Sequence, residues 1–285
     1  MKKTLLLLFF FCCYAMVFSQ NYPSGGDVPK GKTEKPPIDL YKIISFERDT
    51  TYLDTTLSIQ KEYKFNYLRR DNFELLPFAN VGQTYNSLAY SFDNENLMPL
   101  FVAQSHHFSY TVAEDINYYS VPTPLTELYF KTAFSQGQQM DGFFTVNTNE
   151  RFNFSIAYKG VRSLGQYQNA LTSTGNFRFT TNYHTKNNRY HIRAHLAAQD
   201  IFNEENGGLT ENSKLLFETN ESEFQDRGRL DVNFEDADNK LEGLRFFGIQ
   251  EYELISKKDS TGYSIWEIFR LLLATPIMTT GTIRL

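Results

Sequence analysis

The chain has very little cysteine and no long apolar run beyond its N-terminus. Its two cysteines, Cys12 and Cys13, both lie in the apolar stretch near the start, so the rest of the chain has no thiol for a disulfide or a metal site. After residue 20 no apolar run approaches the ~18 residues that a membrane-spanning helix needs. These absences exclude a disulfide-stabilised fold and a bundle of transmembrane helices.

The first residues have the pattern of a secretory signal peptide. Two lysines precede an apolar core over residues 5–18, and the small Ser19 ends it. We therefore expect residues 1–19 to be a signal peptide and the remainder to be exported. Lipidation of Cys12 is not expected, because the bulky Phe11 stands where a small residue should precede the lipidated cysteine.

The sequence also lacks the signatures of several site classes. The formal net charge is -5 and no basic patch follows one element, which argues against a nucleic-acid partner. The glycine-bearing stretch 160–165 has no lysine for a phosphate-binding loop. His191 and His195 would lie ~13 Å apart along an extended strand, too far to share a metal ion. We expect no metal, no cofactor, no catalytic residues and no enzyme activity.

What the sequence has is aromatic residues and two-residue periodicity. Aromatics make up 16% of the chain, with 26 Phe and 18 Tyr but one Trp, a balance typical of strands. The clearest alternation spans residues 189–199, about the length at which a tilted strand crosses a bilayer. Its apolar face carries Tyr190, Ile192, Ala194, Leu196 and Ala198, and its polar face carries His191, Arg193 and His195.

Similar alternation recurs after Pro124 and predicts about seven strands. They are expected over residues 126–134, 142–148, 151–159, 176–184, 189–199, 226–234 and 244–254. The expected links alternate between long and short: 135–141, 160–175 and 200–225 are long, whereas 147–151, 185–188 and 235–240 are short. An outer-membrane barrel has this asymmetry of long external loops and short periplasmic turns. We therefore predict an all-β fold, an antiparallel transmembrane β-barrel of the outer-membrane type that is incomplete in this chain.

The two ends of the mature chain are less regular. Residues 20–124 contain short β-like pieces over 41–48, 57–68, 84–92 and 101–112, and the pattern does not separate a periplasmic section, a lumen plug or early strands. Residues 125–255 are expected to form the transmembrane strand region. In the atypical tail 256–285, the stretch 263–274 has a period near 3.6 and could be a short amphipathic helix. The chain is therefore expected to be the front part of a longer barrel.

Several stretches resemble the putative porins of the Bacteroidetes. They are DTTYLDTTL (49–57), EYKFNYL (62–68), DNFELLPFAN (71–80), PLTEL (124–128), YKGVRSLG (158–165) and ENGG (205–208). The resemblance covers residues 41–254 and implies an outer-membrane β-barrel. Members of that family are longer than this chain, which agrees with an incomplete barrel. The motifs do not state a transported solute.

The expected function is an outer-membrane channel for passive diffusion of small hydrophilic solutes. Its expected surroundings are outer-membrane lipid and lipopolysaccharide, and a homo-oligomer is left open. Two alternatives remain: a non-conducting outer-membrane barrel acting as a scaffold or adhesin, and a soluble exported β-sandwich. The candidate pore-lining residues are the basic side chains Arg178, His191, Arg193, His195 and Arg229, whose charge would favour anions.

Overall fold

The structure, a computed structural model, describes residues 36–69, 75–88, 108–133, 137–219, 222–253, 266–269 and 280–284. All of these belong to one compact unit, Pro36–Leu285. The expected signal peptide and most of the tail lie outside the described residues.

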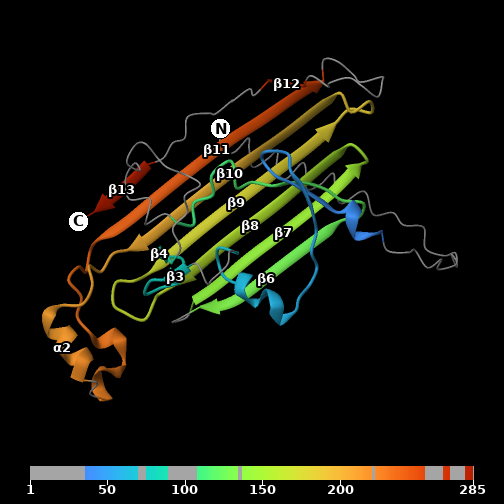
Figure 1. The fold of residues 1–285 in the computed structure, drawn as a ribbon. Helices are drawn as coiled ribbons and strands as arrows, with labels where there is room; N and C mark the ends of the chain where they lie inside the picture. The colour runs from blue at the N-terminus through green and yellow to red at the C-terminus, as the bar shows by residue number, and fades with distance from the viewer. Residues whose placement is uncertain are drawn as a thin grey trace, which may run out of the picture. The chain divides into compact units, whose positions relative to one another are not determined.

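One large antiparallel sheet dominates this unit (Figure 1). Its long strands are β6 (Leu125–Ala133), β7 (Gly137–Asn149), β8 (Phe152–Ser163), β9 (Thr172–His184), β10 (Tyr190–Glu204) and β11 (Asp238–Glu253). Each long strand pairs with its neighbours in sequence, and the short strands β12 (Trp266–Phe269) and β13 (Thr280–Arg284) both pair with the far edge of β11. Within the described residues β6 pairs only with β7, so the sheet is not closed. The all-β expectation of an incomplete barrel is thereby confirmed.

The two faces of this sheet differ in which side chains they bury, and the pattern is the opposite of that in a soluble sheet. Large apolar groups are exposed on one side, which we call the outer face: Leu128 is 81% and Phe130 62% exposed. On the opposite side, the inner face, polar groups are buried: Arg193 is 4% and His195 1% exposed. A sheet in a soluble protein buries its apolar face instead. The period-2 pattern of the sequence therefore separates two faces whose burial is opposite to that of a soluble sheet.

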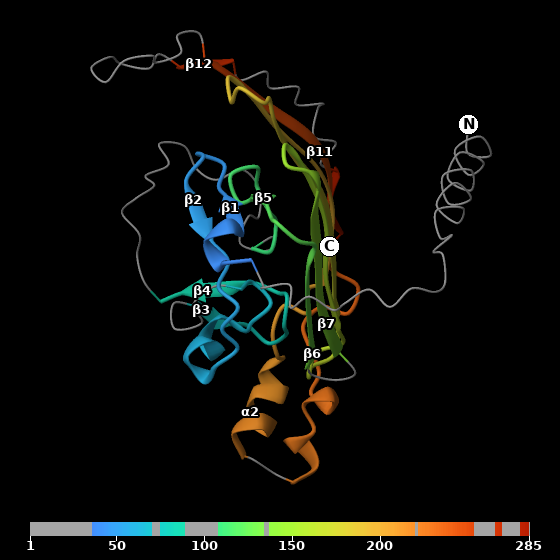
Figure 2. The same ribbon diagram turned by 90° about the vertical axis from the view of Figure 1, so that its right-hand side faces the viewer.

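The inner face is covered by residues 36–69, 75–88 and 108–124, which we call the N-terminal section (Figure 2). It contains a small sheet in the order β2 (Thr50–Tyr52), β1 (Lys42–Ile44), β5 (Tyr118–Ser120) and a hairpin of β3 (Leu75–Pro77) and β4 (Tyr85–Ser87). Two 3₁₀ turns, η1 (Ile38–Leu40) and η2 (Ile59–Lys64), complete it. The main apolar core lies between this section and the inner face, with Tyr67, Ile116, Tyr118 and Val121 on one side and Ala197, Ile201, Phe247 and Ile249 on the other.

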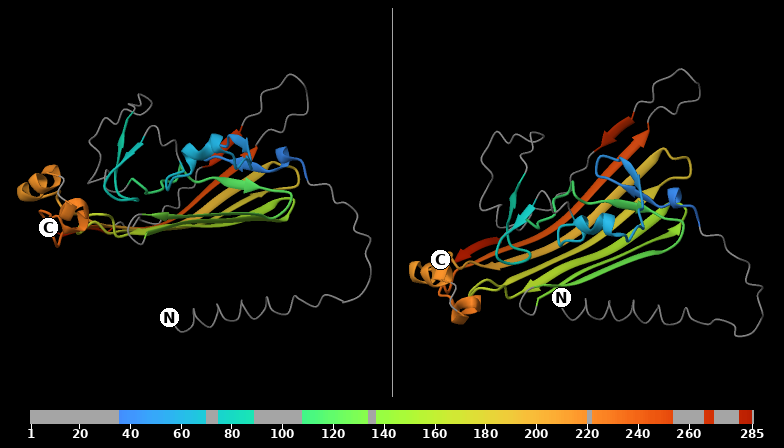
Figure 3. Two further views of the ribbon diagram at one scale, coloured as in Figure 1. Left: turned by 90° about the horizontal axis from the view of Figure 1, so that it is seen from below. Right: turned by 60° about the horizontal axis from the view of Figure 1, so that its bottom comes forward.

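The connection between β10 and β11 differs from the expectation. The predicted strand over 226–234 is wrong: Arg227–Arg229 form a 3₁₀ turn, η6, and only Val232 makes an isolated bridge, to Leu209. Ahead of it lie a helix, α2 (Glu211–Thr219), and another 3₁₀ turn, η5 (Ser222–Gln225). These elements gather at one end of the sheet (Figure 3).

Three further expectations need correction. The β-like stretch 57–68 contains the 3₁₀ turn η2 rather than a strand. The expected long link 135–141 is short, because the strand β7 already begins at Gly137 and pairs Gln138 with Thr132. Within the expected tail helix 263–274, the described residues form the strand β12, and the remainder lies outside the described residues. No helix in the described ranges is both long and apolar enough to cross a membrane.

Candidate functional site

Arg193, on β10, is a central link between the inner face and the N-terminal section. Its Nη2 donates to Glu251 Oε1 at 2.6 Å, and its Nη1 donates to the main-chain oxygens of Ser45 at 2.8 Å and Phe46 at 3.1 Å. Arg48 reaches the same carboxylate from the other side, with 3.0 Å between its Nη1 and Glu251 Oε2. A buried carboxylate placed between two guanidinium groups recovers much of the cost of its desolvation.

His195, one β10 step further along the inner face, forms a second link. Arg245 Nε donates to His195 Nε2 at 3.1 Å, and His195 Nδ1 lies 2.9 Å from the hydroxyl of Tyr118. Because a guanidinium can only donate, Nε2 must accept, and the imidazole proton is therefore assigned to Nδ1, which donates to Tyr118. Burial raises the pKa of Tyr118, which keeps its hydroxyl neutral at physiological pH. The imidazole also stacks on Phe247, with 5.0 Å between the ring centroids.

A third link is built from amides around Thr111. The Thr111 N–H donates to Gln199 Oε1 at 2.8 Å, and Gln199 Nε2 donates back to the Thr111 carbonyl at 2.9 Å. Asn176 and Arg245 add bonds to the Thr111 hydroxyl and carbonyl, each at 3.0 Å. The N-terminal section is thus held by specific polar contacts along the middle of β9, β10 and β11.

A fourth link lies at the β6 edge. The Arg69 guanidinium pairs with Glu127 on β6 at 2.5 Å and with Asp141 on β7 at 3.4 Å, and it lies 4.3 Å from the centroid of the Tyr129 ring. The N-terminal section therefore touches the inner face near both edges of the long-strand sheet.

A pocket of about 550 Å³ opens between the N-terminal section and the sheet, at the end where the short β9–β10 turn lies. Its lining is almost wholly polar: Lys42, Ile44, Arg48, Thr50, Ser120, Asn182, His184, Asn188, His191, Arg193, Glu251 and Glu253. The rings of His184 and His191 stack there with 5.9 Å between centroids. Cationic side chains and hydrogen-bond donors from two parts of the chain converge in this pocket.

The five candidate pore-lining residues do not lie together. His191 and Arg193 line the pocket, and His195 lies deeper, beneath Tyr118. Arg178 lies on β9 opposite Ala157 and Ala197, and its Nε has no hydrogen-bond partner among the described residues.

Arg229 is placed differently from the expectation. It lies in η6, outside the sheet, because the strand predicted over 226–234 does not form, and its guanidinium is 3.8 Å from Asp226. Arg229 is therefore not a neighbour of the other four candidates within the sheet. The pore-lining role of all five stays a prediction.

Sequence reasoning missed the partners of these residues. Glu251 and Arg245 lie on β11, whose alternation is less regular, and Tyr118 and Arg48 lie far away in the chain. The two contacts between Arg193 and the carbonyls of Ser45 and Phe46 span 148 and 147 residues. The available signal was charge complementarity, since Glu251 is an acidic residue near the end of β11 whereas His191, Arg193 and His195 on the neighbouring strand are basic. No group of three or more His, Cys, Asp or Glu side chains suited to a metal ion occurs in the described ranges.

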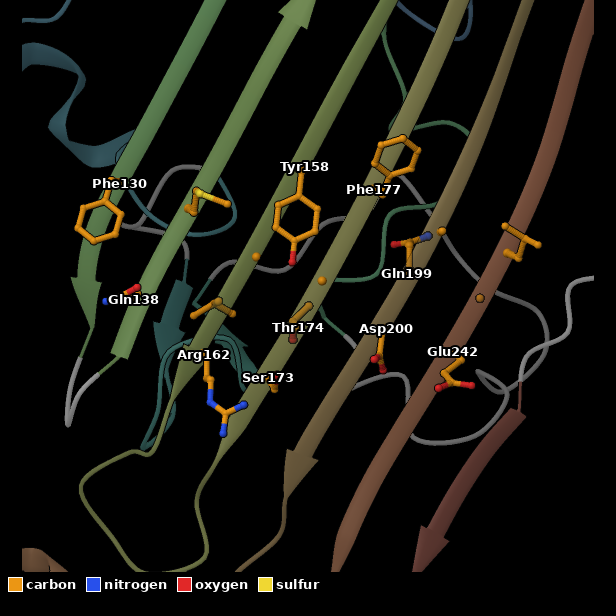
Figure 4. A pocket seen from close by; sticks show the side chains of 17 residues that line it. Phe130, Gln138, Tyr158, Arg162, Ser173, Thr174, Phe177, Gln199, Asp200 and Glu242 are labelled. Atoms are coloured by element: carbon orange, nitrogen blue, oxygen red, sulfur yellow. The ribbon is translucent and has the colours of Figure 1, made fainter. Parts of the chain in front are cut away.

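The outer face carries a second hollow, of about 1010 Å³, around a pair of glycines (Figure 4). Gly160 and Gly175 face each other across β8 and β9, and the ring of Tyr158 lies over both. Apolar groups such as Phe130 and Phe177 surround it, and the charged groups Arg162, Asp200 and Glu242 line one end (Figure 4). An aromatic ring that covers glycines in neighbouring strands stabilises a sheet where side-chain packing is otherwise missing.

Comparison with known proteins places the chain in a family. No curated protein and no solved structure matches it. The model of one protein family, described as putative porin, matches residues 37–274, which includes the N-terminal section from residue 37 onward and all of the long strands. The matched region contains the polar inner face and its four links. The chain therefore belongs to the putative porin family.

Proposed function

We propose that the protein is an outer-membrane porin in which the long strands form barrel wall and small hydrophilic solutes diffuse passively along the polar inner face. The observation that carries this proposal is the inverted burial of the sheet. Leu128, Phe130, Leu244 and Phe246 are exposed on the outer face, whereas Arg193, His195 and Gln199 are buried on the inner face. Membership of the putative porin family supports it.

Lipid and water explain the two faces in physical terms. Burying apolar surface in acyl chains is favourable by roughly 25 cal/mol per Å², so the exposed side chains of the outer face would be stabilised in a bilayer. Backbone groups that lie in lipid must be hydrogen-bonded, and strands satisfy this condition only when a barrel closes. The proposed surroundings are thus outer-membrane lipid and lipopolysaccharide on the outside. A homo-oligomer would cover part of the same surface.

In this proposal the N-terminal section lies inside the lumen. It covers the inner face through polar contacts rather than through a continuous sheet, so it would narrow the lumen. Polar inner-face atoms such as Thr174 Oγ1, Gln139 Oε1 and Arg178 Nε have no hydrogen-bond partner in the described part of the chain. Buried polar atoms of this kind are normally hydrated, as in a wet passage.

Ion conductance tests the proposal. The protein, purified in detergent from the outer membrane, would be added to a planar lipid bilayer under an applied voltage. Reproducible current steps that scale with salt concentration are expected of a water-filled passage. A protein that inserts, shown by heat-modifiable migration on gels, and yet gives no current steps would contradict the channel.

A second candidate is a non-conducting barrel whose lumen is closed by the N-terminal section. The specific observation in its favour is the strength of the links, since Arg193 and Glu251 form a buried ion pair beneath that section. The two candidates differ in the behaviour of Arg193→Gln. If the barrel is closed, the wild-type protein should give no current, and only the Arg193→Gln variant should conduct, because its N-terminal section is loosened. If the protein is a porin, both wild type and variant should conduct.

A further inference from the structure

We propose that the pocket at the β9–β10 turn binds a small oxyanion, a carboxylate or a phosphate. This inference rests on the proposed function, because the solute would reach the pocket through the lumen. The pocket is formed by β1, β2 and β5 of the N-terminal section on one side and by the ends of β9, β10 and β11 on the other. It therefore exists only while the N-terminal section is docked.

Charge balance favours an anion. Three cationic side chains, Lys42, Arg48 and Arg193, line the pocket with two carboxylates, those of Glu251 and Glu253, which leaves one positive charge in excess. Glu251 is already paired with both guanidinium groups, at 2.6 and 3.0 Å. A cation entering the pocket would have to compete with these two ion pairs for Glu251, whereas an anion meets the surplus charge.

The Lys42 ammonium is the group most available to a ligand. Lys42 is exposed on β1 and forms no ion pair with any described residue. An ammonium has three donors and no acceptor, so its natural partner is an oxygen of an anion. A charge-assisted bond to such an oxygen is roughly twice as strong as a neutral hydrogen bond.

Backbone geometry at Arg48 is a second, independent observation. Arg48 adopts a positive φ of 77°, in a turn closed by a 2.9 Å bond from the Ser45 N–H to the Asp49 carbonyl. A non-glycine residue in this region is uncommon. Here this conformation keeps a guanidinium at the wall of the pocket.

The remaining lining agrees with an oxyanion rather than with a neutral ligand. Donor groups come from Thr50, Ser120 and Asn188, together with the two stacked imidazoles. Ile44 is the one apolar side chain among the lining residues, and the lining has no Phe, Tyr or Trp on which a sugar ring could stack. Recognition must therefore come from charge and hydrogen bonds.

Titration calorimetry of the full-length protein in detergent tests the site. Inorganic phosphate and succinate are titrated separately at low ionic strength, with sucrose and choline chloride as neutral and cationic comparators. Saturable binding of at least one anion is expected, and none of either comparator. The relative affinities of phosphate and succinate decide which oxyanion class fits better.

Two variants and one matched control test whether the charges of the pocket determine its affinity for an anion. Lys42→Gln should weaken binding about tenfold, the loss expected for one charge-assisted hydrogen bond. Glu253→Gln should strengthen it, because a repelling carboxylate is removed. Lys186→Gln is the control: it makes the same charge change on an exposed turn residue that does not line the pocket. Its affinity should match that of wild type.

Three outcomes would overturn the site: no saturable anion binding, equal weakening by Lys42→Gln and Lys186→Gln, or weaker binding in Glu253→Gln. Calorimetry does not require a conducting channel, so the two proposals fail separately. Anion binding without current steps would contradict the porin and keep the site, whereas current steps without anion binding would contradict the site alone.

Discussion

Single residues on the inner face make specific contacts with the N-terminal section, beyond what a merely polar surface would need. Arg193 joins a buried carboxylate and two carbonyls of a segment nearly 150 residues earlier in the chain, at distances of 2.6 to 3.1 Å. Such contacts make the docking of the N-terminal section a specific interaction, and they can be broken one at a time.

Replacement of Arg193 should loosen the N-terminal section. Arg193→Gln leaves Glu251 with Arg48 alone, and breaking a buried ion pair costs about 3–5 kcal/mol. We expect faster cleavage of the N-terminal section by a protease added to the folded protein. Arg151→Gln, at an exposed turn, is the control. Equal cleavage rates for wild type and both variants would argue against the link.

Tyr119 makes the docking sensitive to alkaline pH. Burial raises the pKa of Tyr119 to about 12 from the ordinary value of 10.0, and its ring lies 4.6 Å from that of Phe143 on β7. A folded-state pKa above the unfolded value means that this contribution to stability is complete below pH 10.0 and is lost as pH rises towards about 12. Tyr119→Phe should keep the section docked to higher pH than wild type, as measured by protease cleavage and tyrosinate absorbance. Identical pH profiles would contradict this account.

At the scale of elements, the glycines under Tyr158 have a defined role. A Cβ at Gly160 would lie 3.1 Å from the Tyr158 ring and 3.3 Å from the Thr174 carbonyl, whereas one at Gly142 would find its nearest atom at 3.7 Å. Gly160→Ala should therefore destabilise the sheet by about 1–3 kcal/mol through overpacking. Gly142→Ala should be neutral or slightly stabilising, because alanine loses less backbone entropy. Urea unfolding in detergent measures both, and equal effects would exclude the proposed packing.

Strands were the most predictable elements, and connections the least. Period-2 alternation located at least one end of β6, β8, β9, β10 and β11 to within one residue, where the outer face is apolar. β10 ends five residues beyond its predicted end and β11 begins six residues before its predicted start, because the outer face there carries charged side chains such as Asp200 and Glu242. The same alternation failed over 226–234, where Leu230 and Val232 are buried by a folded loop rather than by a neighbouring strand.

The helix α2 was missed because its composition suggested only an acidic loop. The signal that could have found it is Thr210, whose hydroxyl accepts from the Ser213 N–H at 3.2 Å, as an N-cap does. A capping residue of this kind is short and local, so it is easily overlooked beside a run of acidic side chains.

At the scale of the whole molecule, the sequence predicts two faces but not what covers the polar one. The alternation of Arg193 and His195 with apolar neighbours is local, whereas their partners in the N-terminal section are distant and lack a periodic pattern. The sequence therefore predicts the candidate site as a polar stripe on one face. It does not predict the pocket, which forms only where the distant N-terminal section meets that stripe.

A charge placed on the outer face should destabilise the protein in a bilayer, and the cost should be larger the deeper the residue lies in the bilayer. Phe246, 44% exposed, pairs with Leu196 near the middle of β10 and β11, whereas Gln138 lies near the end of β7. Phe246→Arg should cost about 2–4 kcal/mol in a bilayer and Gln138→Arg about 0–1 kcal/mol. Folding into lipid vesicles, titrated with urea, measures the difference. Equal costs for Phe246→Arg and Gln138→Arg, with no dependence on depth, would contradict the membrane assignment.

The central claim is that the apolar outer face meets lipid, and adjacent phenylalanines on β11 test it directly. Phe246 lies on the outer face, whereas Phe247 is buried on the inner face beside Phe46. Both cysteines of the chain lie within the expected signal peptide, so Phe246→Cys and Phe247→Cys each give one labelling site. With a fluorophore at each position, brominated lipids should quench the label at 246 and leave the label at 247 unchanged. Quenching at 247 with none at 246 would contradict the account.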